Sequence, residues 1–187
     1  MRLEARWTLT LRDKHGRTLK RRSFRAKSFV RASLTWFAHH WSGGGPYSTP
    51  DWVNTSRALA ANVGYSAKGA ANDDTKGIVV GTGTNAVAGT DYALQTLIAD
   101  GTGAGQLDYG LEAYSTPTAS ATLVSFTHTR TFTNNSGGSI TIQEVGFYIQ
   151  EGAQSYRFCF ERSLVAGGFA VAAGATVTIE SAFKVTY

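Results

Sequence analysis

Cysteine is almost absent from this sequence of 187 residues, because Cys159 is the only one. A single thiol cannot close an internal disulfide, so the fold has to be stabilised by packing or by assembly. No run of about 18 apolar residues occurs, which excludes a predicted membrane-spanning helix. The charges near Met1 are not followed by an apolar segment, so we expect neither a secretory signal nor a membrane partner.

Motifs for catalysis and cofactor binding are also scarce. Residues 81–86 (GTGTNA) formally match a dinucleotide-binding fingerprint, but no helical pattern follows them, so we interpret them as a tight turn. His39 and His40 lack the spacing of metal ligands, and the acidic residues lack the spacing of a calcium loop. Cys159 lies between two phenylalanines, which favours a packed thiol over a nucleophile. The sequence therefore predicts no enzyme, no cofactor and no metal site.

Positive charge is concentrated at the start of the chain. Residues 1–40 contain eleven lysines and arginines against two acidic residues, whereas the remainder carries seven against eleven. The densest part is the run at 20–27 (KRRSFRAK). We favour an acidic patch on a neighbouring subunit as its partner; a solvated face and nucleic-acid phosphate are the alternatives.

The first segment is predicted to form a β-hairpin. Trp7, Leu9 and Leu11 alternate with polar residues, a pattern typical of a half-buried strand. Residues 13–16 (DKHG) indicate a turn, and residues 17–24 can return as the partner strand.

An amphipathic helix is predicted to follow the hairpin. Ser28 is a suitable N-cap, and the segment Gly43-Gly44-Gly45-Pro46 would end the helix. The apolar residues on one face, spaced i, i+4, i+7 and i+11, are Val30, Leu34, Phe37 and Trp41. This face is wide and aromatic, so we expect the sheet or a neighbouring subunit to cover it.

The remainder of the chain has the pattern of a β-protein. Glycine is frequent (21) and proline is rare (3), which suits a fold with many tight turns. Residues 91–98 are predicted as a short helix or a loop, and Ala166-Gly167-Gly168 as the end of a strand. The predicted strands cover residues 78–80, 110–114, 121–132, 140–149, 156–162 and 176–187.

These elements predict a mainly β fold, an antiparallel β-sandwich or jelly roll with an N-terminal hairpin and one helix. We expect three parts: a basic hairpin-and-helix arm at 1–45, an irregular connection at 46–76 and the sandwich core at 77–187. An irregular segment as long as the second part is unusual in a compact monomer, and it favours contact with a partner.

Several segments, taken in their order along the chain, form a layout that recurs in one class of proteins. They are Ser28-Phe29-Val30-Arg31, residues 77–84 (GIVVGTGT) followed by 91–94 (DYAL), residues 105–110 (GQLDYG), residues 130–138 (RTFTNNSGG), residues 140–148 (ITIQEVGFY) and the closing strand from Gly174. Together they resemble small structural proteins of tailed bacteriophages, in particular tail-fibre and collar proteins. The resemblance implies an oligomeric virion component of the capsid, neck, tail or baseplate, made in the host cytoplasm, whose partners are copies of itself and other virion proteins.

Aromatic and arginine side chains dominate the energetics of protein interfaces, so the N-terminal part is the predicted contact region. The predicted subunit-interface residues are Arg21, Arg22, Arg25, Phe29, Val30, Leu34, Trp36, Phe37 and Trp41. The alternative hypothesis is a glycan-binding sandwich that uses Trp36, Trp41, Trp52, Tyr47 and Tyr114 as platforms. An enzyme, such as a hydrolase acting on cell wall or capsule, is the third and least favoured hypothesis, because the sequence has no coherent set of histidines, cysteine or carboxylates.

Overall fold

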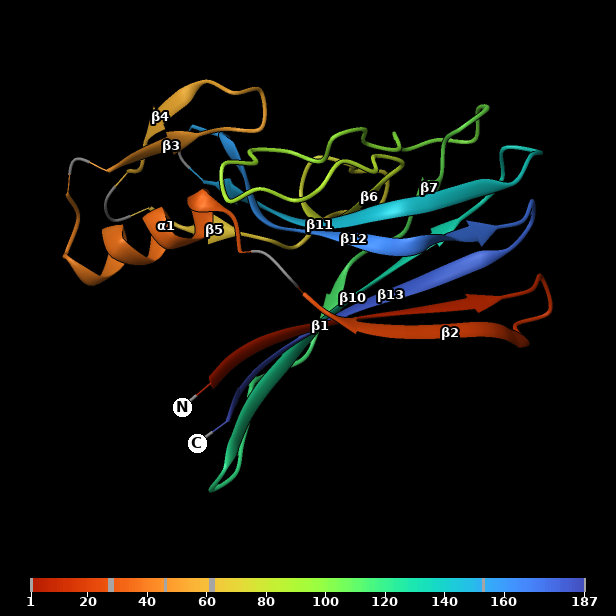
Figure 1. The fold of residues 1–187 in the computed structure, drawn as a ribbon, viewed down its shortest axis with the longest axis horizontal. Helices are drawn as coiled ribbons and strands as arrows, with labels where there is room; N and C mark the ends of the chain where they lie inside the picture. The colour runs from red at the N-terminus through yellow and green to blue at the C-terminus, as the bar shows by residue number, and fades with distance from the viewer. Residues whose placement is uncertain (1, 27–28, 46, 61–62, 153, 187) are drawn as a thin grey trace.

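The chain folds into two antiparallel β-sheets that face each other, with one helix at one end (Figure 1). The computed structural model describes residues 2–26, 29–45, 47–60, 63–152 and 154–186. The predicted mainly β, sandwich-like fold is therefore confirmed.

The larger sheet has the strand order β2-β1-β13-β10-β7, and β8 and β9 also pair with β10. Its strands are β1 (Arg2–Arg12), β2 (Thr18–Arg25), β7 (Asp108–Tyr109), β8 (Ala113–Tyr114), β9 (Thr118–Ala119), β10 (Leu123–Thr133) and β13 (Thr176–Thr186). The smaller sheet has the order β12-β11-β5, and β6 also pairs with β11. Its strands are β5 (Tyr65–Ser66), β6 (Gly77–Gly81), β11 (Ile140–Glu151) and β12 (Arg157–Val171), while β3 (Ser48–Pro50) and β4 (Ser56–Ala58) form a separate ribbon.

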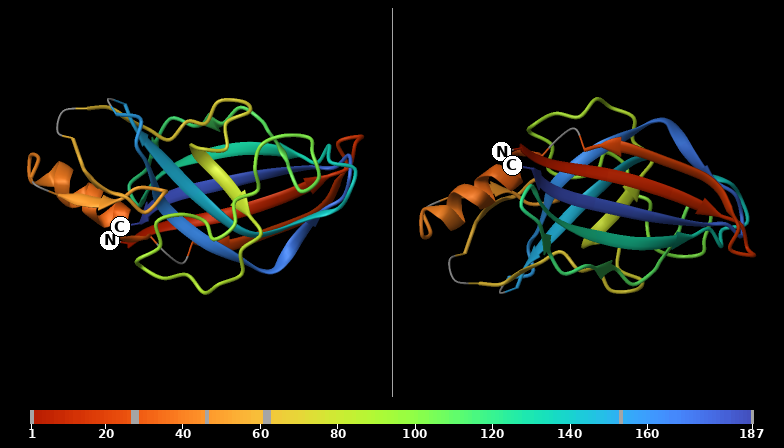
Figure 2. Two further views of the ribbon diagram at one scale, coloured as in Figure 1. Left: turned by 90° about the horizontal axis from the view of Figure 1, so that it is seen from above. Right: turned by 90° about the horizontal axis from the view of Figure 1, so that it is seen from below.

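The predicted N-terminal hairpin is present and belongs to the larger sheet. β1 pairs with β2 on one side and with β13 along its whole length on the other, from Arg2 opposite Thr186 to Arg12 opposite Thr176. The two chain ends consequently lie side by side (Figure 2). The hairpin thus shares a sheet with the predicted core at 77–187, and the division of the chain after residues 45 and 76 stays a prediction.

The core lies between the facing sheets, where alternate side chains of each strand point inward. Leu9 and Ile179 of the larger sheet are fully buried, as are Val145 and Phe169 of the smaller sheet. Each large apolar side chain buried in this way contributes roughly 1.5–3 kcal/mol. The packing of the two sheets thus supplies the main stabilisation of a chain that has no disulfide.

The helix α1 (Arg31–Trp41) begins later than the sequence predicts. Val30 occupies the N-cap position, and its carbonyl oxygen accepts hydrogen bonds from the backbone N–H and the hydroxyl of Ser33, at 3.0 and 2.7 Å. The predicted end is confirmed, because the N–H of Gly44 donates to the carbonyl of His39 at 2.9 Å. Ser28, the predicted N-cap, lies outside the described residues, as do Lys27 of the basic run and Pro46.

The predicted strand end at Ala166-Gly167-Gly168 is wrong, because β12 continues through these residues to Val171. Gly167 and Gly168 have φ angles of 71° and 67°, in the left-handed region that favours glycine. The register between β12 and β11 also shifts between Ile142 and Glu144. The glycines therefore form a bulge within the strand, and they do not end it.

Two other predicted elements are only partly present. The predicted strand at 110–114 is reduced to the two residues of β8. Residues 91–98 form a loop, one of the two predicted alternatives, and this loop buries the side chains of Leu94 and Ile98.

The buried side chain of Arg130 on β10 fastens the irregular segments to the sandwich. Its guanidinium group uses all five N–H donors on backbone carbonyl oxygens at 2.6–3.0 Å, and it lies over the ring of Tyr109 with 4.8 Å to the centroid. The five acceptors belong to Gly110, Lys76, Ile78, Ala70 and Asp73. One side chain thereby holds the connection before β6 and the segment after β7 against β10.

We predict that Arg130→Met lowers the free energy of unfolding by at least about 3 kcal/mol, because it leaves buried carbonyl groups without donors. Arg130→Lys keeps the charge but offers three donors without the planar fork, so we expect an intermediate loss. Urea denaturation followed by circular dichroism measures both. A loss below about 1 kcal/mol for Arg130→Met would show that the five hydrogen bonds do not support the fold.

A carboxyl group, that of Glu161 on β12, is buried between the sheets. The indole N–H of Trp7 donates to Glu161 Oε2 at 2.9 Å, and the hydroxyl of Ser163 bonds to Oε1. Burial raises the pKa of the Glu161 carboxyl from 4.5 to about 8, although both hydrogen bonds act in the opposite direction. The folded chain therefore keeps a proton on Glu161 at neutral pH, whereas the unfolded chain loses it.

This difference in protonation makes stability depend on pH. Between pH 4.5 and about 8 the folded state binds more protons than the unfolded state at Glu161, so its contribution to the free energy of unfolding falls as pH rises. We predict that Glu161→Gln is more stable than the native chain at pH 8 by on the order of a few kcal/mol, with little difference near pH 4.5. Urea titrations across this range measure the effect, with Glu180→Gln on the larger sheet as the control. Parallel pH profiles for the native chain and Glu161→Gln would contradict the assignment.

Candidate interaction surface

The nine predicted interface residues do not form one surface in the structure. Val30 is fully buried, and it packs in the core. Phe29, Trp36 and Phe37 line a hollow at the helix end of the molecule. The others are exposed or half-buried, Leu34 and Trp41 on α1, and Arg21, Arg22 and Arg25 on β2.

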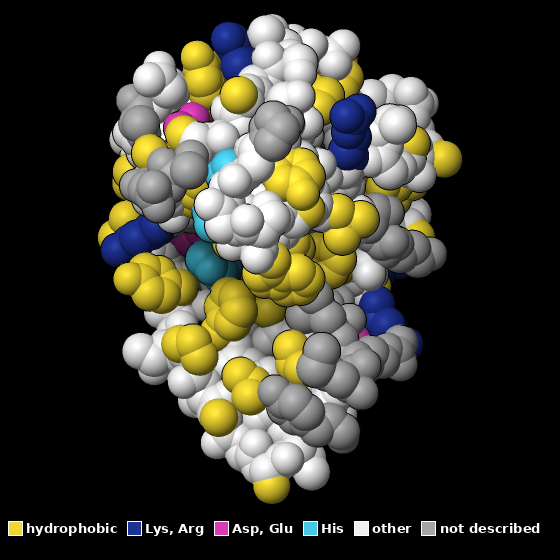
Figure 3. Space-filling view, turned by 90° about the vertical axis from the view of Figure 1, so that its left-hand side faces the viewer, with side chains coloured by type: hydrophobic (Ala, Val, Ile, Leu, Met, Phe, Trp, Pro, Cys, Tyr) yellow, Lys and Arg dark blue, Asp and Glu magenta, His cyan; other side chains and the backbone are white. Residues whose placement is uncertain are grey.

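The hollow is an apolar cavity of about 370 Å³ between the two sheets and α1. Figure 3 views the molecule from this end, where hydrophobic side chains gather around a depression. In addition to Phe29, Trp36 and Phe37, the lining consists of Tyr65, Ala67, Phe126, His128, Phe147, Ile149, Phe160 and Phe183. Both sheets and the helix therefore contribute to one aromatic wall.

Phe160 joins the helix to the sheets within this wall. Its ring makes edge contacts with Phe29, Trp36 and Phe37 at centroid separations of 6.2, 5.9 and 5.7 Å. Offset and edge-on aromatic pairs contribute about 0.5–1.5 kcal/mol each beyond the burial of their area. Half of the predicted apolar helix face is thereby covered by the smaller sheet.

His128 is the basic side chain in the described lining of the hollow. Its Nδ1 lies 2.9 Å from Oε1 of Glu112, which is completely buried. The other carboxylate oxygen of Glu112 accepts the backbone N–H groups of Gly69 and Ile78 at 3.0 and 3.1 Å. Because a carboxylate can only accept, an imidazole that is neutral at this position carries its proton on Nδ1, and its Nε2 is then an acceptor. Among the described residues, none hydrogen-bonds to Nε2.

An apolar stripe on α1 lies beside the hollow, and its two outer residues remain exposed. The side chain of Leu34 is 66% exposed and that of Trp41 is 84% exposed. Phe37 lies between them on the helix, and its ring contacts that of Trp41 at 5.6 Å. Exposed apolar residues that are contiguous on a surface mark interaction sites. We call Leu34, Phe37 and Trp41 the helix stripe.

The basic run lies on β2, which is the edge strand of the larger sheet. Arg22 donates to the carbonyl of Gly168 at 3.2 Å, and Lys20 lies over the ring of Phe169 at 4.9 Å. Positive side chains on an edge strand also prevent the strand from pairing with other molecules. Through these contacts the basic run joins β2 to β12 of the same chain. An acidic patch on a neighbouring subunit stays a predicted partner.

Sequence reasoning missed most of the lining of the hollow. Phe126, His128, Phe147 and Phe183 come from three strands, and each of them was recognisable only as one inward position of its own strand. The register places Phe126 opposite Phe183, and their rings stack at 5.0 Å. The alternating pattern identifies such inward positions, but it does not show which of them meet.

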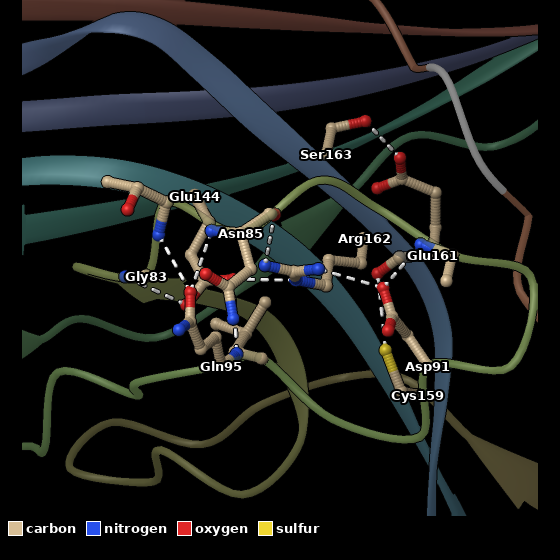
Figure 4. A network of polar contacts seen from close by, with 12 residues as sticks. Gly83, Asn85, Asp91, Gln95, Glu144, Cys159, Glu161, Arg162 and Ser163 are labelled. Carbon is tan, nitrogen blue, oxygen red and sulfur yellow. Dashed lines mark hydrogen bonds and ion pairs between the residues drawn. The ribbon is translucent and has the colours of Figure 1, made fainter.

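A second cluster of charges lies on the outer face of the smaller sheet, around Glu144 and Arg162 (Figure 4). Arg162 Nε donates to Glu144 Oε2 at 2.7 Å, and Arg162 Nη1 donates to Asp91 Oδ2 at 2.8 Å. Glu144 is fully buried and also accepts the backbone N–H groups of Gly83, Gln95 and Thr96 at 2.9–3.2 Å. The network ties the loop at 82–98 to β11 and β12.

This network explains the glycines that resemble a nucleotide-binding motif. A Cβ atom on Gly81 would lie 2.6 Å from Oε1 of Glu144, and one on Gly83 would be closer still. Residues 82–86 form an irregular loop after β6, and no helix begins there. The loop closes around a carboxylate of the same chain, so its N–H groups are already bonded.

We predict that Arg162→Met lowers the free energy of unfolding by about 3–5 kcal/mol, because it leaves the buried carboxylate of Glu144 without its cation. Arg17→Met removes a comparable arginine–aspartate pair, Arg17–Asp13, whose arginine side chain is largely exposed. We expect no measurable change for this matched control. Thermal and urea unfolding compare the two variants, and equal effects would contradict the structural role of the network.

The five aromatic residues of the glycan-binding alternative lie apart in the structure. Trp36 and Trp52 pack against the core, whereas Trp41, Tyr47 and Tyr114 are exposed. Tyr114 belongs to β8, at the opposite edge of the larger sheet from β2. An exposed, extended platform of several rings is therefore not formed by these five residues.

Comparison with known proteins gave no relative: no family model, no curated protein and no solved structure matches this chain. Among the described residues, no helix has the length and hydropathy needed to span a membrane.

Proposed function

We propose that this chain is a structural subunit of a bacteriophage virion, which acts by packing against copies of itself and other virion proteins. The observation that carries the proposal is the pairing of two uncovered apolar features at one end, the hollow and the helix stripe. A folded chain that leaves such surfaces in water gains free energy when another polypeptide covers them. The segment resemblance described for the sequence supports the virion as the setting.

The polar groups at the helix end support the same proposal. Glu151 is fully buried, and burial raises the pKa of its carboxyl above the ordinary value. Each unsatisfied buried group lowers the stability of the fold by roughly 1–3 kcal/mol, so the helix end is the less stable part of the isolated chain. Among the described residues, the buried polar atoms there without a hydrogen-bond partner are Trp36 Nε1, both ring nitrogens of His39, Thr49 Oγ1, both carboxylate oxygens of Glu151 and Arg157 Nε.

The chemistry of the buried charges favours packing over catalysis. Arg130, Glu144 and Arg162 are each held by several hydrogen bonds from the chain itself. Burial raises the pKa of the Cys159 thiol well above its ordinary value, so the thiolate required of a nucleophile does not form at neutral pH. These groups explain how the fold is held together, which is what a structural subunit requires.

We predict that particles purified from a host carrying this gene contain the chain in many copies. Gradient-purified particles would be analysed by quantitative mass spectrometry, and immunogold electron microscopy would locate the chain on them. A regular labelled position, such as a ring at the neck or along the tail, is the expected result. A chain that stays in the soluble fraction and is missing from intact particles would overturn the proposal, and a glycan array then tests the alternative.

A further inference from the structure

Among the described residues no side chain fills the hollow, and Leu34 and Trp41 of the helix stripe are largely exposed at the same end of the molecule. We infer that two copies of the chain associate through this end, with the helix stripe of each copy lying in the hollow of the other and the indole of Trp41 inside it. This inference names one contact of the proposed assembly, and it rests on the proposed function to that extent.

The spacing of the helix stripe fits a helix that docks in a groove. Leu34, Phe37 and Trp41 stand at i, i+3 and i+7, which is the anchor pattern of amphipathic helices bound in apolar grooves. The two outer anchors are about 10 Å apart along the axis, from the rise of 1.5 Å per residue. The hollow is lined by aromatic rings from both sheets, so it offers edge and face contacts to an incoming ring.

We place the occupant of the hollow on another molecule, because no described side chain of the helix stripe other than Phe37 reaches it. Phe37 is the member of the helix stripe that lines the hollow of its own chain. Leu34 and Trp41 are not in that lining, and most of their surface faces solvent. A second copy brings the missing apolar residues without requiring any other protein.

The polar group in the hollow matches the side chain that we place there. In the neutral imidazole, a proton on Nδ1 directed at Glu112 leaves Nε2 of His128 as an acceptor, and the indole nitrogen of tryptophan is a donor only. Trp41 can therefore bury its ring against the phenylalanines while its N–H donates to His128. A leucine or phenylalanine in the same place would leave the imidazole nitrogen without a partner.

Twofold symmetry allows both contacts to form together. The hollow and the helix stripe adjoin each other, so a twofold axis near α1 brings each helix stripe to the partner's hollow. Such an interface closes at two copies. It leaves the outer face of the larger sheet and the tip of the N-terminal hairpin, at the opposite end in Figure 1, available for other virion proteins.

Three variants of the full chain test the contact by sedimentation velocity at several concentrations. Trp41→Ala removes the inserted ring, and Ala67→Trp fills the hollow from within its own lining. Leu19→Ala, at a half-exposed leucine on β2 near the far end, is the control. We expect the native chain and the control to form dimers, and the first two variants to dimerise at least tenfold more weakly.

Mixing the two weakened variants distinguishes this contact from others. Ala67→Trp retains its Trp41, and Trp41→Ala retains its hollow, so an equal mixture can form one of the two contacts. We expect the mixture to associate more strongly than either variant alone, and the indole N–H signal of Trp41 in an isotope-labelled sample to shift when it does. Circular dichroism confirms that each variant is folded before it is used.

The possible outcomes separate this inference from the proposed function. A Trp41→Ala chain that dimerises like the native chain, or a mixture no stronger than its components, overturns the contact. If those variants still enter particles at native levels, the virion proposal stands without it. If the dimer depends on Trp41 but the chain is missing from particles, the contact stands and the virion proposal falls.

Discussion

The five hydrogen bonds of the Arg130 guanidinium group are the interaction on which the rest of the structure depends. Arg130 projects from β10 of the larger sheet into the interior, where an unpaired cation would be very costly. Its donors are satisfied by carbonyl groups of irregular backbone, which would otherwise be buried without partners. The charge and the irregular segments therefore stabilise each other, and β6 lies where it does because the residues before it are bound to β10.

The other buried charges also form hydrogen bonds with irregular backbone of the same chain. The carboxylate of Glu112 accepts hydrogen bonds from the backbone N–H groups of Gly69 and Ile78. Glu144 and Arg162 hold the loop at 82–98 on the outer face of the smaller sheet. Long irregular segments ordinarily lower the stability of a compact domain, because they bury polar backbone and lose conformational entropy. Here side chains from the strands provide the missing donors and acceptors. The smaller sheet is thereby covered on both faces, which explains why so much of β11 and β12 is buried.

The helix end differs from this closed core. The larger sheet diverges from the smaller one toward the end that carries α1 and both termini (Figure 1), and aromatic side chains take the place of a continuous interior. The hollow results because rings from the two sheets and the helix surround a space that no side chain of the described residues occupies. Apolar rings, one oriented histidine and an uncovered helix stripe make this the part of the molecule best suited to receive another polypeptide.

The sequence by itself determined the N-terminal hairpin, the helix and the long strands β10, β11 and β13, because alternation with period 2 or 3.6 and the glycine-rich turns depend on neighbouring residues alone. It also predicted the apolar helix face of Val30, Leu34, Phe37 and Trp41, but not that Val30 is buried in the core. It did not determine that Gly167 and Gly168 form a bulge, since a bulge depends on the register with another strand. Only the tertiary structure decided that His128 meets Glu112, that Arg130 binds five carbonyl groups and that Phe126 stacks on Phe183. Those contacts join residues far apart in the chain, and the pairing of the strands, together with the packing of the sheets, selects them.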